Sequence, residues 1–269
     1  RREMLNLILL ALSVGVSVGL AVGIPALSPW WLIGMIPLGY ILATALYFIL
    51  LFATVPFLPK GGDGEKSSRF CRFIIWLSCD WLMALLRIRT RLTGLKLPKE
   101  PFVLVSNHRS DFDPMVFLQK ARRRNLIYIS KESNFKFPLV GPYIRGAGYY
   151  AIDRDNGMRA LRTLKKVTER MTAEGLDVGI YPEGTRSKTG ELLEFKTGAF
   201  YLAKKANAPV VVMTTEGTEV IAQNFPWKGA KIHLNVVEIL TREQVAAMSM
   251  EELALHVRNT IAEHLQTNA

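Results

Sequence analysis

The chain has 269 residues, of which 49% are hydrophobic, and its formal net charge is +11. This length fits one domain with added elements, and the charge points to anionic membranes or acidic small molecules, with nucleic acid a weaker alternative because the charge is spread. The two cysteines, Cys71 and Cys79, lie in one apolar segment without metal-binding spacing, which excludes a disulfide scaffold and indicates a reducing compartment.

The N-terminal part contains an uncharged run of 56 residues that begins at Met4. A membrane span needs about 20 residues, so the run is long enough for two. The segment Pro25–Pro29 divides it into Met4–Ile24 and Trp30–Phe57, which predicts a membrane helical hairpin within residues 1–60. Two alternatives stay open, namely a hairpin that enters one leaflet only and a buried hairpin of a soluble protein.

Basic residues flank this hairpin on both sides, whereas the segment between its two helices has none. The positive-inside rule therefore places both ends, and everything after Lys60, on the cytoplasmic side, and it places Trp30 and Trp31 at the far interface. Residues 61–92 are expected to form a glycine-rich joint and, over Phe70–Ile88, a helix at the membrane surface or an ordinary core helix. The flanking basic residues are Arg1, Arg2, Lys60, Lys66, Arg69 and Arg72.

From Arg89 onward, short apolar strands alternate with amphipathic helices, which is typical of an α/β domain. We predict a mixed sheet flanked by helices over residues 93–269. The expected strands are 102–106, 126–130, 149–152, 178–181, 210–214 and 232–239, and the expected helices are 114–123, 158–174, 197–206 and 250–266.

Two of these helices carry clear end signals. Gly175 is expected to end helix 158–174, and Ser249 with Glu252 forms a capping box at the start of helix 250–266. In helix 158–174, Arg170 is expected away from the buried face, which is formed by Leu161, Leu164, Val167 and Met171.

The stretch Asn107–Pro114 lies between the first expected strand of this domain and the helix that follows. His108 precedes Asp113 by five residues, so one loop can bring an imidazole and a carboxylate together. Such a carboxylate fixes the tautomer of the imidazole and stabilises the imidazolium, which a general base requires. Asp113 before Pro114 also suits a helix N-cap, and a cap without a catalytic role is therefore the alternative.

Three cationic residues follow expected strands, namely Lys131, Arg154 and Arg186. In open α/β sheets, ligands bind beyond the carboxyl ends of the strands. A guanidinium group binds a phosphate monoester through two hydrogen bonds, and a glycine such as Gly184 lets backbone N–H groups approach it. We expect a phosphate-bearing substrate here, while a surface ion pair is the commoner role of any single arginine.

These blocks, in this order and spacing, resemble the glycerolipid acyltransferase family, and most closely its bacterial 1-acyl-sn-glycerol-3-phosphate acyltransferases (lysophosphatidic acid acyltransferases). The matching blocks contain His108 with Asp113, Gly148 with Arg154, the segment Pro182–Ser187, and Pro209. The resemblance covers about residues 93–217. It departs at Ala151 and Ala208, where bulkier apolar residues are usual, and this leaves the shape of the substrate pocket open.

The resemblance implies a glycerol-3-phosphate acyltransferase-like fold and an enzyme of phospholipid biosynthesis. Such an enzyme transfers a fatty acyl group from an acyl thioester, on acyl carrier protein or coenzyme A, to the free hydroxyl of 1-acyl-glycerol-3-phosphate, which makes phosphatidic acid. It implies that His108 is the general base and Asp113 its partner. The substrate-binding residues it implies are Lys131, Arg154, Glu183, Gly184, Thr185 and Arg186.

We expect no metal, because the other histidines, His233, His256 and His264, look solvated and no histidine–carboxylate cluster has metal spacing. No cofactor is expected beyond the acyl-thioester co-substrate. Neither cysteine lies in the matching blocks, and those blocks contain no Gly-x-Ser-x-Gly elbow, so direct transfer is favoured over an acyl-enzyme.

Because acceptor and product are membrane lipids, the expected location is the bacterial inner membrane with the α/β domain on its cytoplasmic side. Membrane lipids and an acidic carrier or coenzyme A thioester are the expected partners, and nucleic acid is not. They would be attracted by the basic residues Lys120, Arg122, Arg123 and Arg124. Acylation of another lysophospholipid, by remodelling or transacylation, and a non-catalytic membrane lipid-binding module are the alternatives.

Overall fold

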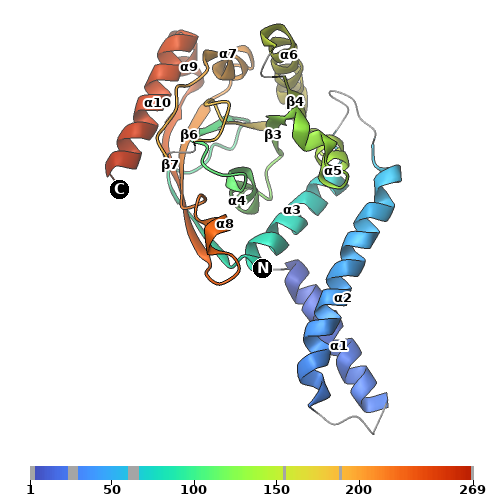
Figure 1. Ribbon diagram of the computed structural model, residues 1–269. Helices are drawn as coiled ribbons and strands as arrows, with labels where there is room; N and C mark the ends of the chain where they lie inside the picture. The colour runs from blue at the N-terminus through green and yellow to red at the C-terminus, as the bar shows by residue number, and fades with distance from the viewer. Residues whose placement is uncertain (1–3, 24–29, 60–66, 154–155, 188–189, 268–269) are drawn as a thin grey trace.

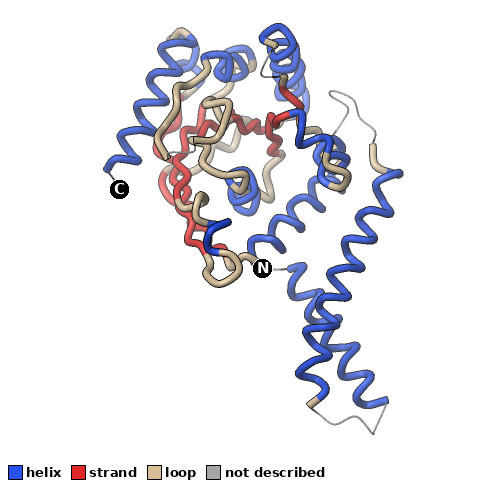
Figure 2. The backbone as a smooth tube through the Cα atoms, viewed as in Figure 1, coloured by secondary structure: helices blue, strands red, loops and turns tan. Residues whose placement is uncertain are grey.

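The protein is described by a computed structural model that covers residues 4–23, 30–59, 67–153, 156–187 and 190–267. Within these residues, a mixed sheet is flanked by helices, and a pair of N-terminal helices extends away from it (Figure 1). The predicted fold class is thereby confirmed. In Figure 2 the strands of this sheet are red, and the helices that flank it are blue.

The sheet consists of β1 (Ile88–Gly94), β2 (Val103–Ser106), β3 (Leu126–Lys131), β4 (Tyr150–Ile152), β5 (Asp177–Ile180), β6 (Val210–Glu216) and β7 (Ala230–Leu240). Their spatial order is β1-β7-β6-β2-β5-β3-β4. The five adjacent strands from β6 to β4 are parallel, whereas β7 is antiparallel to β6 and parallel to β1. The carboxyl ends of five neighbouring strands therefore meet at one edge.

Helices cover both faces of this sheet. The N-terminal part contains α1 (Met4–Gly23), α2 (Trp31–Thr54) and the short 3-10 helix η1 (Val55–Phe57). The remaining helices are α3 (Arg69–Leu85), α4 (Asp113–Lys120), η2 (Glu132–Lys136), α5 (Val140–Gly146), α6 (Gly157–Glu174), η3 (Thr197–Phe200), α7 (Tyr201–Lys205), α8 (Ile221–Asn224), α9 (Arg242–Ala247) and α10 (Met250–Thr267).

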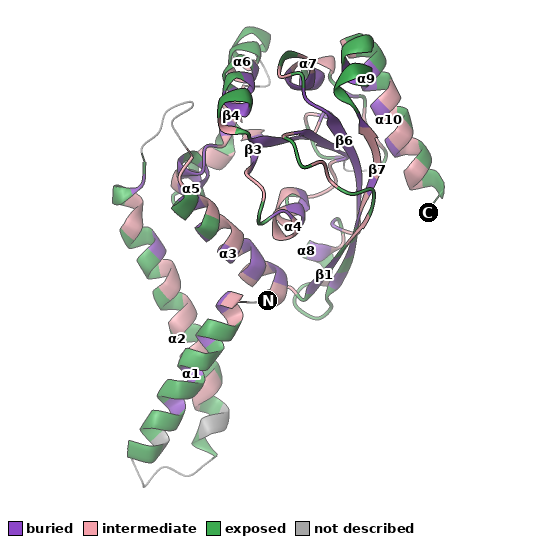
Figure 3. Cartoon of the chain, turned by 180° about the vertical axis from the view of Figure 1, so that it is seen from behind, coloured by how far each residue is buried: buried purple, intermediate pink, exposed green. Residues whose placement is uncertain are grey.

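The alternation of side chains along the strands creates two cores. Val103 and Val105 of β2 point to a core formed with α6, α7, α9 and α10, whereas Leu104 points to a core formed with α3, α4 and α8. The central strands β2 and β5 are buried along their whole length, and their neighbours β3 and β6 are largely purple in Figure 3. Burial on both faces explains the apolar run Val103–Val105 of β2.

All six expected strands are present, with ends within two residues of those predicted. β1 was not predicted, because the helix that begins near Phe70 was expected to continue to Ile88. The helix in fact ends at Leu85, and Arg87 turns the chain with a φ of 53°. The expected helix 197–206 is divided into η3 and α7, and α5, α8 and α9 were not predicted.

The predicted ends of α6 and α10 are confirmed. Gly175 adopts a left-handed conformation after α6, and Ser249 and Glu252 exchange both hydrogen bonds of the capping box. The predicted buried face of α6 was partly wrong. Leu161 is 50% exposed, whereas Arg170 is buried because Glu174, one turn later, accepts a hydrogen bond from its Nε at 2.8 Å.

The N-terminal helices α1 and α2 pack against each other and dock on α3. The indole Nε1 of Trp81 donates to the Tyr40 hydroxyl at 3.2 Å, and the hydroxyls of Tyr47 and Ser78 lie 2.8 Å apart. Of the described residues, Gly34–Phe57 form the one helical stretch that is long and apolar enough to cross a membrane, and 6% of its apolar 18-residue window is buried; Met4–Leu20 form a shorter apolar helix. This exposure weighs against a buried soluble hairpin.

Several residues used to predict the hairpin and its orientation lie outside the described residues. They are Arg1, Arg2, the break Pro25–Pro29, Lys60, the joint at Gly61–Gly64, and Lys66. The position of the hairpin relative to a membrane, and the membrane contact of α3, stay predictions. The same holds for the predicted division of the chain at residues 60 and 92.

We predict that Gly175→Ala lowers the free energy of unfolding by about 1 kcal/mol, because its φ of 64° is costly for a residue with a Cβ atom. Chemical denaturation in detergent measures the change. Gly157→Ala is the matched control on the same helix, because a Cβ atom there meets no other atom within 4 Å. Equal stabilities of the two variants would contradict the prediction.

Candidate functional site

The candidate site lies at the carboxyl edge shared by the parallel strands. His108 follows β2, Tyr181–Ser187 follow β5, and Lys131 ends β3. Lys131 is paired with Ile152, the last residue of β4, so it lies beside the end of that strand. In the sequence, Arg154 follows β4 by two residues. Arg154 itself lies outside the described residues.

The imidazole of His108 is held by the carboxylate of Asp113. Its Nδ1 lies 2.8 Å from Asp113 Oδ2, and the two side chains are 13% and 0% exposed. The same oxygen accepts the backbone N–H groups of Arg109 at 2.8 Å and Ser110 at 2.9 Å. An ionised carboxylate only accepts hydrogen bonds, so Nδ1 carries the proton and Nε2 is the nitrogen that can accept one.

Asp113 is not the N-cap of α4, which corrects the sequence analysis. Phe112 occupies the cap position without a side-chain hydrogen bond, and Asp113 is the first residue of the helix. Its carboxylate turns back to the preceding loop, where it binds His108 through Oδ2 and accepts a hydrogen bond from the Thr218 hydroxyl through Oδ1. A capping role alone does not account for these contacts.

Glu183 joins the loop after β5 to the loop that carries His108. Its Oε1 accepts the backbone N–H of His108 at 2.6 Å, and its Oε2 accepts that of Leu193 at 3.1 Å. Burial raises the pKa of Glu183, although both hydrogen bonds favour the charged form. The backbone N–H of Ser187 also donates to the His108 carbonyl at 2.9 Å, which fastens the two loops from both sides.

Gly184 gives the loop after β5 its turn. Its φ is +70°, and a Cβ atom at this position would lie 2.9 Å from Cε of Lys196. The conformation therefore favours a glycine, whereas the flexible end of Lys196 could move aside for a Cβ atom. The next residues, Thr185 and Arg186, are exposed at the rim of the site.

Tyr181 and three polar residues were not predicted as part of the site. The ring of Tyr181 stacks on His108 with centroids 4.2 Å apart. Asn107 exchanges two hydrogen bonds with the backbone of Thr215, at 2.8 and 2.9 Å, and Thr218 binds Asp113. The rule that sites form at strand ends, applied to β6, would have drawn attention to both threonines.

The predicted phosphate-binding residues are only partly brought together among the described residues. Lys131 and Arg186 lie at the same edge of the sheet, and the Arg186 guanidinium forms an exposed ion pair with Asp111. Pro209, by contrast, precedes β6, and its carbonyl accepts the N–H of Val103 at 3.0 Å. It therefore lies at the opposite edge of the sheet from His108.

The other histidines were not all predicted correctly. His233 is exposed, but His256 is half-buried with its Nε2 2.9 Å from Glu238, and His264 Nε2 lies 2.9 Å from the Asn235 amide. Both tie α10 to β7 instead of being simply solvated. Among the described residues, no group of three or more His, Cys, Asp or Glu side chains is placed to hold a metal ion.

Comparison with known proteins shows that this chain is similar to acyltransferases in sequence and in fold. The sequence model of the Acyltransferase family matches residues 89–216. The chain is 41% identical over 111 residues to human 1-acyl-sn-glycerol-3-phosphate acyltransferase beta, which covers 41% of this chain and 40% of the human protein. It is 23% identical over 163 residues to a 1-acyl-sn-glycerol-3-phosphate acyltransferase of Haemophilus influenzae, covering 61% and 68% of the two chains.

A solved structure with the same fold is the 1-acyl-sn-glycerophosphate (LPA) acyltransferase PlsC from Thermotoga maritima. It superposes with a TM-score of 0.64 and 24% identity, and the match covers 85% of this chain and 92% of that one. In sequence, the chain spans about half the length of the curated relatives it matches, with 40%, 53% and 57% for three of them.

We predict that Glu183→Gln destabilises the fold by about 2 kcal/mol. The carboxylate accepts a hydrogen bond from each of two backbone N–H groups, whereas the glutamine amide would turn its NH2 group, a donor, toward one of them. Thermal unfolding in detergent measures the loss. Glu194→Gln is the control, since Glu194 is exposed in the same segment. A melting temperature equal to that of the control would show that the two hydrogen bonds do not hold the loops.

Proposed function

We propose that the chain is a 1-acyl-sn-glycerol-3-phosphate acyltransferase, because the sequence model of the Acyltransferase family matches its residues 89–216. It transfers a fatty acyl group from an acyl thioester to the free hydroxyl of lysophosphatidic acid and so forms phosphatidic acid. The observation that carries the proposal is the His108–Asp113 pair, 2.8 Å apart at the edge where parallel sheets bind ligands. The names of the human and Haemophilus influenzae relatives support the choice of acceptor.

In the proposed reaction, Nε2 of His108 removes the proton of the acceptor hydroxyl while that oxygen attacks the thioester carbonyl. The carbon–sulfur bond then breaks, and the imidazolium returns the proton to the departing thiolate. Asp113 keeps Nδ1 protonated throughout and stabilises the positive charge that forms on the ring. No atom of the protein becomes acylated.

The stacked ring of Tyr181 and the Glu183 hydrogen bond to the His108 backbone hold the base in place. Fixing a catalytic group relative to two substrates is itself a large part of such catalysis, because it removes the entropy cost from the reacting step.

We assign the acceptor phosphate to Lys131, Arg154 and Arg186, with Gly184 and Thr185 shaping the loop between them. Arg186 is now paired with Asp111, and both side chains are more than half exposed. An exposed pair of this kind is weak, so a phosphate group can replace Asp111 as the partner of Arg186. The bidentate geometry of a guanidinium group suits that exchange.

We place the α1–α2 hairpin in the bacterial inner membrane with the α/β domain on its cytoplasmic side, where an acyl thioester of acyl carrier protein or coenzyme A is available. Support comes from the exposed apolar surface of α2 and from the basic flanks of the hairpin. A membrane location brings the enzyme to its lipid acceptor. The proposed chemistry requires no metal or other cofactor.

We predict that His108→Ala reduces transfer from a labelled acyl thioester to lysophosphatidic acid by about 100- to 10,000-fold, the usual contribution of a general base. The assay uses detergent micelles and both thioester donors. His233→Ala is the matched control, because His233 is exposed on β7 and makes none of the hydrogen bonds that hold the His108–Asp113 pair. Equal activity of the native protein and His108→Ala would refute the mechanism, and inactivity of native protein would refute the proposed reaction.

We predict that Arg186→Ala raises the KM for lysophosphatidic acid about tenfold, as expected for one lost charge-assisted contact. With a monoacylglycerol acceptor, which has no phosphate, the same variant should match the native protein. Arg162→Ala, an exposed arginine on α6, serves as the control for a general change in charge. An equal loss with both acceptors would exclude phosphate recognition by Arg186.

A further inference from the structure

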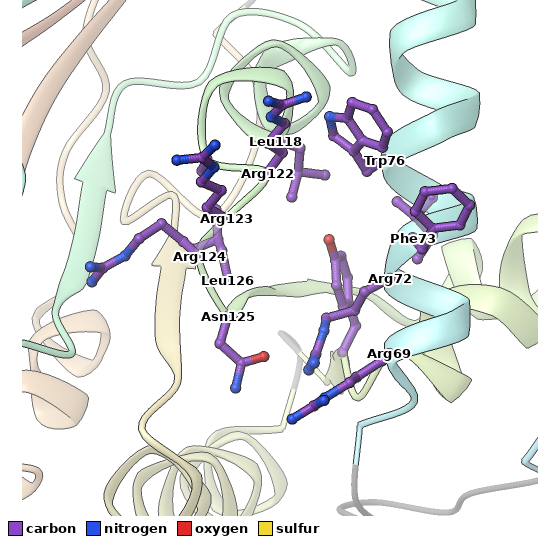
Figure 4. A pocket seen from close by; sticks show the side chains of 13 residues that line it. Arg69, Arg72, Phe73, Trp76, Leu118, Arg122, Arg123, Arg124, Asn125 and Leu126 are labelled. Atoms are coloured by element: carbon purple, nitrogen blue, oxygen red, sulfur yellow. The ribbon is translucent and has the colours of Figure 1, made fainter. Parts of the chain in front are cut away.

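A cavity of about 580 Å³ lies between the N-terminal half of α3 and the end of α4, and the proposed reaction does not use it (Figure 4). The start of β3 forms its floor through Asn125 and Leu126. His108 follows the carboxyl end of β2, whereas this cavity opens at the amino end of β3. Strands β2 and β3 run in the same direction, because each is paired in parallel with β5. The cavity and the candidate active site are therefore at opposite edges of the sheet.

The walls of the cavity combine positive charge with apolar rings. Arg69, Arg72, Phe73 and Trp76 follow the i, i+3, i+4, i+7 spacing, so they lie on one face of α3. Arg122 faces them from the segment after α4, with its guanidinium 5.6 Å from the centre of the Trp76 ring, and Arg123 also lines the cavity. None of the described residues that line the cavity is acidic.

The positive charge of the cavity is only partly balanced within the described protein. Arg124 is engaged outside the cavity, with Nε 2.6 Å from Asp177, and it points away from the other arginines in Figure 4. Burial and the neighbouring charge of Arg69 both lower the pKa of Arg72, while Glu174, the acidic residue near it, is bound by Arg170. Such a concentration of like charge favours the binding of an anion.

Two polar atoms of the lining are buried and have no hydrogen-bond partner among the described residues. They are the indole Nε1 of Trp76, which is a donor, and Oδ1 of Asn125, which is an acceptor. Buried polar groups are nearly always hydrogen-bonded, so each unpaired one calls for an explanation. A phosphate oxygen can accept from the indole N–H, and a hydroxyl on the same ligand can donate to the amide oxygen.

We propose that this cavity is a binding site for the headgroup of an anionic phospholipid, separate from the active site. The arginines hold the phosphate, and Phe73, Trp76 and Leu118 contact the apolar part next to it. Phe73 is 47% exposed, which leaves apolar surface at the mouth of the cavity for the lipid chains. A lipid is favoured over free phosphate because the anion-binding groups and the apolar groups line the same space.

The site also lies where a lipid can reach it, given that the proposed function puts the hairpin in the membrane. The hairpin docks on α3 through Tyr40 and Tyr47, and α3 carries one wall of the cavity. Binding of the headgroup would stabilise the contact between α3 and the segment after α4.

The test is isothermal titration calorimetry of the full chain in an uncharged detergent, with short-chain phosphatidylglycerol as the probe. This lipid has no free acyl-acceptor position of the lysophosphatidic acid type, and binding is measured without acyl transfer, so failure of the proposed reaction would not affect the result. Short-chain phosphatidylcholine and inorganic phosphate separate the contributions of net charge and of the apolar part.

We expect phosphatidylglycerol to bind at least tenfold more tightly than either phosphatidylcholine or inorganic phosphate. Arg69→Gln and Arg122→Gln should each weaken binding about tenfold, since each removes a charge-assisted contact. Trp76→Phe keeps an aromatic ring but removes the indole donor, and it should weaken binding about threefold. Arg162→Gln, on the exposed face of α6, should leave the affinity unchanged.

Three outcomes would overturn the proposal. Equal affinities for phosphatidylglycerol and phosphatidylcholine would exclude recognition of charge. Binding of inorganic phosphate as tight as that of phosphatidylglycerol would show a simple anion site. Native affinity in Arg69→Gln and Arg122→Gln, with native melting temperatures, would exclude this cavity as the site.

Discussion

The carboxylate of Asp113 is the interaction on which the candidate site depends. Its two oxygens accept hydrogen bonds from the His108 ring, from two backbone N–H groups of the same loop and from Thr218 after β6. One fully buried side chain thus fixes the loop after β2, the start of α4 and the segment after β6. A buried carboxylate is tolerated when it is this well bonded, and its removal would leave several donors unpaired.

The sheet separates two positively charged regions with different surroundings. At its carboxyl edge, Lys131 and Arg186 stand at an exposed rim beside the His108–Asp113 pair. At its amino edge, Arg69 and Arg122 line a cavity together with Trp76. The first arrangement suits a substrate that must enter, react and leave, whereas the second suits a ligand held between two helices. Part of the net charge of +11 is therefore concentrated in two separate regions and does not serve only as a general attraction for anions.

The sequence was most informative where the partners lie close together along the chain. His108 and Asp113 share one loop, so their spacing could predict their contact, but Thr218 is more than 100 residues away and meets Asp113 only because β6 lies beside β2. Likewise, β1 was missed because Arg87 ends the preceding helix with a left-handed turn and without a glycine to signal it. Arg170 was placed on the wrong face because its burial depends on Glu174 and on the Gly148 carbonyl.

The hydrogen bonds that fasten the hairpin to α3, between Trp81 and Tyr40 and between Tyr47 and Ser78, have a kinetic consequence for the proposed membrane enzyme. They connect the apolar helices to the α/β domain through side chains and not only through the covalent link after η1. With the hairpin in a bilayer, such a connection holds the proposed catalytic base, His108, at a constant height above the lipid headgroups. Turnover then follows the mole fraction of acceptor in the plane of the membrane, and its bulk concentration in water becomes irrelevant.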